Sequence, residues 1–132
     1  MKLFFSFLFL AFSLHLSAQE TKQTCNDLPL ADPEVRASCL TEDILSPFKG
    51  ALTEKLKKGT HTAVFKFFVT CNGEVTNVAY QRGTVDSSTQ SIFAAEINKL
   101  KWKPATHKSK QVTSVVFLTI EIVNAQITIS IR

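Results

Sequence analysis

The chain has three cysteines, Cys25, Cys39 and Cys71, which are its residues with the widest chemical repertoire. In an oxidising compartment a disulfide can form and leave one of them unpaired. We predict that Cys25 pairs with Cys39, because both flank one short segment upstream of the best-patterned strands. Cys71 then stands at a strand end beside a turn. Our preferred interpretation is a half-buried small apolar residue, and the alternative is an intermolecular or reactive thiol.

Other chemistry-bearing residues form no recognisable site. His61 and His107 are far apart in the sequence, and no closely spaced ligand pair of the kind that structural zinc needs is present. A Cys–His nucleophilic pair could arise only through folding, because no local signature marks one. The acidic residues are dispersed, and the four glycines form no phosphate-binding loop. We therefore expect no metal, no cofactor and no enzymatic activity.

The first residues have the three parts of a signal peptide. Lys2 provides the positive start, residues 3–16 are largely apolar, and Ser17-Ala18 supplies small residues for cleavage. The apolar run, residues 3–16, is short for a transmembrane helix, which needs about 20 apolar residues. We expect cleavage after Ala18, export to the periplasm or beyond, and no stable membrane anchor afterwards.

Charge and length limit the remaining possibilities. The chain has 15 Lys and Arg against 11 Asp and Glu, and no run of like charge exceeds Lys57-Lys58. A nucleic-acid binder usually has a basic stripe with interleaved aromatic residues, so nucleic acid is not an expected partner. The residues after the signal peptide suffice for one core. We divide them into an N-terminal extension, residues 19–45, with a possible disulfide and a helical turn at Asp32-Pro33-Glu34, and a domain at residues 46–132.

Two segments of the domain have helical patterns. Ser46-Pro47 is a typical helix start, and Phe48, Leu52 and Leu56 recur at helical spacing before Gly59. The second helix begins at one of the candidate caps 86–88 and runs to about residue 99. Its apolar stripe consists of Phe93, Ile97 and Leu100. Both segments are therefore predicted to be amphipathic helices.

The period changes to two in four other segments. Residues 63–69 alternate, and Asn72-Gly73 predicts a tight primed hairpin turn to a returning strand at residues 74–81. Val75 is out of phase there, so either it faces the other side or a bulge intervenes. After a polar loop at residues 106–110, residues 112–122 alternate again. A possible turn at Asn124-Ala125 leads to a last alternating segment, residues 127–131. The predicted class is α+β, with two helices packed on a small, mostly antiparallel sheet of three or four strands.

An ordered set of short motifs covers most of residues 48–122. The pieces are Phe48-Lys49-Gly50, Leu52, the strand 63–69, Asn72-Gly73-Glu74-Val75, Val78-Ala79-Tyr80, Ala94-Ala95, Leu100, Trp102-Lys103-Pro104-Ala105 and Val112. Their succession resembles the C-terminal domain of TonB energy transducers. The family motif maps onto Gly73, Trp102, Pro104 and Ala105, where the indole can close one end of the core and the proline can direct the chain into the next strand.

Several features depart from that family. The hairpin here has the sequence Cys71-Asn72-Gly73, where family members often carry an acidic residue. The entry to the third strand also differs from that of the family, because residues 109–112 are Ser-Lys-Gln-Val. A true transducer keeps a membrane helix with Ser-x-x-x-His, but here Ala11 stands four residues before His15. The long Pro-rich spacer is also missing. The protein is therefore not expected to transmit force.

The resemblance implies a function in protein binding related to transmembrane transport. TonB domains take up an extended segment of an outer-membrane receptor as an added strand. The expected edge here is the strand containing Ser114, Val116, Leu118 and Ile120, provided that residues 127–131 leave it free. If they pair there, the tail itself becomes the exposed edge or a place for a second copy. The alternatives are an enzyme with Cys71 as a thiol nucleophile, and a structural, disulfide-linked homodimer of the envelope.

Overall fold

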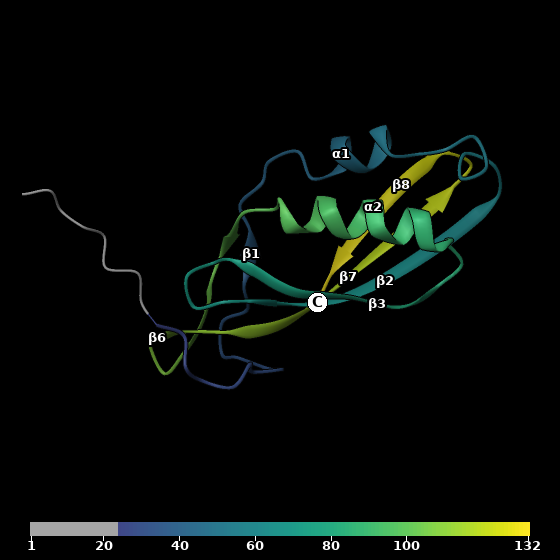
Figure 1. The fold of residues 1–132 in the computed structure, drawn as a ribbon. Helices are drawn as coiled ribbons and strands as arrows, with labels where there is room; N and C mark the ends of the chain where they lie inside the picture. The colour runs from purple at the N-terminus through teal and green to yellow at the C-terminus, as the bar shows by residue number, and fades with distance from the viewer. Residues whose placement is uncertain (1–23) are drawn as a thin grey trace, which may run out of the picture.

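A four-stranded antiparallel sheet forms the centre of the fold in the computed structural model, which describes residues 24–132 (Figure 1). The strand order is β3-β2-β7-β8. The strands are β2 (Thr60–Val69), β3 (Val75–Gly83), β7 (Ser114–Val123) and β8 (Gln126–Ile131). The predicted α+β class with a four-stranded sheet is thus confirmed. The expected signal peptide, residues 1–18, lies outside the described residues.

Two helices and two small sheets complete the fold. Helices α1 (Leu45–Gly50) and α2 (Ser87–Asn98) lie on the same side of the sheet (Figure 1). β1 (Ser38–Cys39) pairs with β4 (Trp102–Lys103), and β5 (Ala105–His107) pairs with β6 (Lys110–Val112). Part of the N-terminal extension is thereby built into the domain. Its predicted helical turn at residues 32–34 is absent, because the chain there runs toward a bridge between Val35 and Thr106.

The core lies between the sheet and the helices, as the period-two patterns predict. Alternate residues of β2 and β7 point to the helix side and are buried, because one face of each strand packs against α1 and α2. The fully buried large side chains are mostly aromatic and branched aliphatic: Phe48, Phe65, Phe67, Phe93, Ile97, Leu118, Ile120, Ile122 and Val69. The opposite face of the sheet has no helix over it in the described part of the chain (Figure 1).

The two predicted helices differ in how well the sequence delimits them. α2 begins after Asp86, whose carboxylate accepts a 2.8 Å hydrogen bond from the backbone N–H of Thr89. That bond lowers the pKa of Asp86 below its usual value. α1 is shorter than predicted and ends at Gly50, before Leu52 and Leu56. Leu56 is buried, as its apolar spacing predicted, but it reaches the core from a turn and not from a helix.

The β2–β3 turn is built differently from the primed turn that we predicted. Gly73 has a positive φ of 80°, whereas Asn72 is absent from the described residues with positive φ. The backbone N–H of Gly73 donates to the carbonyl of Thr70 at 2.8 Å, and Thr70 N–H donates to the carbonyl of Glu74 at 2.8 Å. This is a three-residue loop with glycine in the left-handed position. The pairing register of β2 and β3 then shifts between Lys66 and Phe68. This shift confirms a bulge, which was one of the two explanations offered for the out-of-phase Val75.

A two-residue primed turn connects β7 and β8 instead. Asn124 and Ala125 have φ values of 47° and 70°, and Val123 faces Gln126 across the turn. The twist of such a turn matches the right-handed twist of the strands, which explains the tight hairpin. Lys108 and Ser109, at φ 51° and 60°, connect β5 to β6 in the same way. The polar segment predicted as a loop is therefore a small hairpin.

Ala125→Gly is expected to raise the free energy of unfolding by about 0.5–1 kcal/mol, because a left-handed conformation costs an alanine more than a glycine. Ala125 is exposed, so no packing is lost. Chemical unfolding in urea measures the change. Ala95→Gly is the matched control: Ala95 is exposed within α2, and glycine there should destabilise by about 1 kcal/mol. If both variants lost the same free energy of unfolding, the inference that Ala125 is strained in this turn would be refuted.

Candidate functional site

The strand predicted to bind a peptide lies inside the sheet. β7 pairs with β2 on one side and with β8 on the other. Beyond β8, Phe117 N–H donates to the carbonyl of Arg132 at 2.8 Å, and Val115 N–H donates to the carbonyl of Leu30 at 2.9 Å. The Asn124-Ala125 turn is the physical cause, because it folds the tail directly onto β7.

The four residues assigned to that edge are consequently core residues. Ser114, Val116, Leu118 and Ile120 have exposed fractions of 1%, 4%, 0% and 0%. Their side chains lie on the helix side of an interior strand, and their backbone belongs to a paired ladder. The assignment of a peptide-binding edge to them was therefore wrong. The alternative for an occupied edge applies, and the tail itself, β8, is the outermost strand.

The sheet has two outer edges, and they differ in regularity. β3 contains two register shifts against β2, and it includes Asn77 and Gly83 at φ values of 55° and 143°. Bulges of this kind twist an edge away from pairing. β8 pairs with β7 without any shift over its six residues. β8 is therefore the edge better suited to receive another strand.

The outward-facing groups of β8 follow from the hydrogen-bond alternation. Phe117 and Arg132 exchange two backbone bonds, of 2.8 and 2.9 Å, so they form a hydrogen-bonded pair. In an antiparallel ladder such pairs alternate with pairs whose N–H and C=O point away. The outward groups are therefore those of Ile127, Ile129 and Ile131. Within residues 24–132 no backbone partner is found for these groups outside the strand ladder.

A surface hollow of about 350 Å³ lies beside the start of β8. Its lining comes from α1 and from the β7–β8 hairpin: Leu45, Lys49, Ala125, Gln126, Ile127 and Thr128. Lys49 is the only charged residue of this lining, and the rest is apolar or neutral polar. A side chain of an added strand could enter this hollow, since alternate residues of such a strand point to one face.

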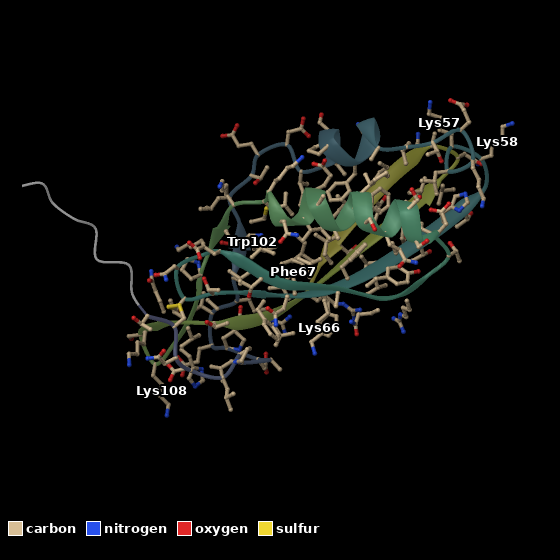
Figure 2. All side chains as sticks on the ribbon, in the orientation of Figure 1. Lys57, Lys58, Lys66, Phe67, Trp102 and Lys108 are labelled. Atoms are coloured by element: carbon tan, nitrogen blue, oxygen red, sulfur yellow. A yellow bond between two sulfur atoms is a disulfide. The ribbon has the colours of Figure 1, made fainter. Side chains whose placement is uncertain are left out.

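The four residues of the family motif gather at one end of the core. Trp102 is 4% exposed, and its ring meets that of Phe67 edge to face with centroids 5.5 Å apart. Figure 2 shows both rings on the helix side of the sheet. A Cβ atom on Gly73 would collide with the carbonyl oxygen of Trp102 and touch the ring of Pro104. Ala105 is fully buried. This group fixes the hairpin to the core, and Gly73 and Trp102 also line a surface hollow beside Leu40 and Glu74.

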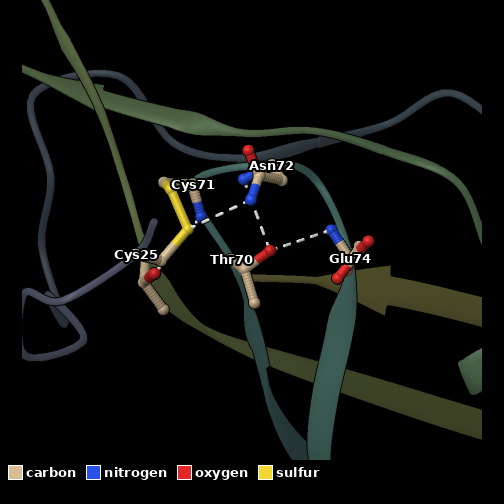
Figure 3. The surroundings of a disulfide bond; sticks show 6 residues. Cys25, Thr70, Cys71, Asn72 and Glu74 are labelled. Atoms are coloured by element: carbon tan, nitrogen blue, oxygen red, sulfur yellow. Dashed lines mark hydrogen bonds between the residues drawn. A yellow bond between two sulfur atoms is a disulfide. The ribbon is translucent and has the colours of Figure 1, made fainter. Parts of the chain in front are cut away.

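The disulfide joins Cys25 to Cys71, so the predicted Cys25–Cys39 pairing was wrong (Figure 3). Cys39 is held in β1 opposite Trp102, whereas Cys25 lies beside the β2–β3 turn. Asn72 reinforces this link, because its side-chain amide donates to the sulfur of Cys25 at 3.6 Å. Sequence separation alone could not reveal this pairing, since the extension reaches the turn only in the folded chain.

The same disulfide changes the assignment of the free thiol. Cys71 was predicted to be the unpaired cysteine, which was wrong, because it is 3% exposed and bonded to Cys25; the alternative of a nucleophilic Cys71 thiol is thereby contradicted, and Cys39 is the free, half-buried cysteine. His61 Nε2–H donates a 2.8 Å hydrogen bond to the carbonyl of Lys58, and His107 Nδ1 accepts one from the backbone N–H of Glu34 at 3.4 Å. In the described part of the chain no cluster of three metal-ligating side chains occurs.

Comparison with known proteins adds no assignment. No protein-family model matches the chain, and no curated protein matches it either. Across residues 24–132 no helix is long and apolar enough to cross a membrane. The resemblance to TonB C-terminal domains therefore remains a prediction from the sequence motifs.

Proposed function

We propose that the protein is an exported binding module that takes up an extended peptide as a fifth strand on the outer edge of β8. The observation that carries this proposal is the regular, unshifted course of β8 as the last strand of the sheet. Its outward N–H and C=O groups at Ile127 and Ile129 supply main-chain hydrogen bonds, and the hollow beside Lys49 supplies side-chain selectivity.

The resemblance to TonB C-terminal domains supports a peptide as the ligand of this edge. It implies an extended segment of an outer-membrane receptor, and therefore a role related to transmembrane transport in the periplasm. The Cys25–Cys71 disulfide agrees with an oxidising compartment. A hydrogen-bonding edge also needs no catalytic group, which agrees with a binding protein that is not an enzyme.

Titration with synthetic receptor-derived segments, followed by NMR of backbone amides, tests this function. We expect the largest shifts at Ile127, Ile129 and Ile131, because the new hydrogen bonds form there. Shifts confined to β3 would move the site to the other edge and contradict the assignment to β8. Self-association that shifts the same β8 amides without added peptide would favour the homodimer.

Ile129→Pro is expected to weaken peptide binding by about fivefold to tenfold, because proline removes one outward donor and its ring occupies the path of the added strand. The bonds from β8 to β7 come from the flanking residues and are retained. Ile129→Val is the matched control, since it keeps the N–H and most of the side chain. Affinities from NMR titration measure the difference, and equal affinities of the two variants would contradict strand addition at β8.

A further inference from the structure

The helix-free face of the sheet carries an open groove of about 600 Å³. Its floor is apolar and comes from two central strands: Val64 on β2, and Val115 and Phe117 on β7. Val64 is 7% exposed and Phe117 is 38% exposed, so the groove has a closed floor and an accessible aromatic side chain. The groove lies on the opposite side of the sheet from α2, where Lys66 also projects (Figure 2).

Three arginines surround this apolar floor. Arg36 comes from the N-terminal extension, Arg82 from β3 and Arg132 from the residue that follows β8. Arg36 makes an exposed ion pair with Asp32 at 3.3 Å, whereas Arg82 and Arg132 have no side-chain hydrogen bond or ion pair among the described residues. Within the described part of the chain, no acidic residue lines the groove.

The distribution of charge over the face is one-sided near the groove. Lys66 lies on the same face between Val64 and Phe68, directly opposite Phe117. The acidic residue on the helix-free face of β7 is Glu121, which stands four residues from Phe117 and is therefore about 13 Å away along the strand. The groove therefore combines an apolar floor with a positive rim, in which Arg36 is paired with Asp32 while Arg82 and Arg132 have no acidic side-chain partner among the described residues.

We propose that this groove binds an acidic segment of a partner protein in which carboxylates alternate with apolar or aromatic side chains. Arginine favours carboxylates through its planar fork of donors, and the exposed Phe117 ring offers contact to an apolar side chain. The arginines come from three separate segments, which suits several anionic groups along a chain better than one small anion. This site lies on another surface than the β8 edge and does not depend on strand addition.

Binding of a short fluorescent peptide in which Glu and Asp alternate with Leu and Phe tests the proposal. The protein is obtained by expressing the full chain for export, and fluorescence anisotropy gives the affinity at low and high salt. We expect Arg82→Gln combined with Arg132→Gln to weaken binding about tenfold or more, and added salt to weaken binding to the parent protein. Both arginines are exposed, and thermal unfolding verifies that the variant folds.

A control variant shows whether binding of the acidic peptide depends on this groove. Lys58→Gln removes one positive charge at the far end of the molecule (Figure 2), and it should not change affinity for the acidic peptide. Equal binding by the double arginine variant and the parent would overturn the proposal. Arginine-dependent binding to vesicles containing phosphatidylglycerol, with no binding of the peptide, would overturn it in favour of a membrane surface.

Discussion

Trp102→Ala is expected to lower the free energy of unfolding by about 3–5 kcal/mol, the range for removing a large aromatic side chain from a packed core. Trp102 is almost completely buried and packs edge to face on Phe67. Its backbone carbonyl also lies where a side chain on Gly73 would stand, so movement of Trp102 disturbs the β2–β3 hairpin. Urea unfolding followed by circular dichroism measures the loss.

Two further variants show whether the loss comes from the core position. Trp102→Phe should cost much less, about 1 kcal/mol, because the ring volume is partly kept and the buried indole N–H, which has no hydrogen-bond partner among the described residues, is removed. Leu40→Ala, at a side chain 59% exposed, should change stability by less than about 0.5 kcal/mol. A Trp102→Ala loss as small as that of Leu40→Ala would show that the indole does not close the core.

The alternation of apolar residues predicted the sheet because burial of one face leaves a signal in every second residue. β7 follows that signal over its full length and β2 follows it from Phe65 to Val69, and α2 begins after Asp86, the first of its three candidate caps. α1 had the correct apolar spacing but no signal for where the chain leaves the helix. Leu52 and Leu56 can pack on the core without helical backbone, so the spacing did not fix the length of α1.

Turn geometry and cysteine pairing depend on contacts that are distant in the sequence. Asn72-Gly73 has the composition of a primed turn, yet the primed geometry occurs at Asn124-Ala125, where alanine is a poor residue for it. Cys25 meets Cys71 because the extension crosses the sheet end through Leu30 and its bridge to Ser114. No local pattern in residues 19–45 encodes that path.

The candidate sites were only partly accessible from the sequence. The tail strand and its turn were predicted from the sequence, so a β7 edge covered by the tail was one of two alternatives. The other was a free β7 edge, and the sequence pattern could not decide between them. The arginine-lined groove was missed, since Arg36, Arg82 and Arg132 are far apart in the sequence and show no basic run. The local sequence signal for the groove was the pair Val64 and Lys66. Their alternation predicted a face, away from the helices, on which a charged residue stands beside an apolar one.

Removal of the disulfide, by Cys25→Ala combined with Cys71→Ala, is expected to lower the free energy of unfolding by about 2–4 kcal/mol. The two residues are 46 positions apart, so the bond restricts a long segment of the unfolded chain. Alanine at position 71 keeps a small apolar group in a site that is 3% exposed. Because Cys71 N–H donates to the hydroxyl of Thr113 through the backbone, that bond survives.

Cys39→Ala is the matched control, since Cys39 is the free cysteine and is only half-buried. It should cost less than about 1 kcal/mol. Urea unfolding compares the variants, and mass spectrometry after alkylation without reductant should find one modified thiol, at Cys39. Alkylation at Cys25 or Cys71 would contradict the disulfide and with it the path of the N-terminal extension across the sheet, because that bond and the Leu30 bridge hold the extension where Arg36 borders the groove.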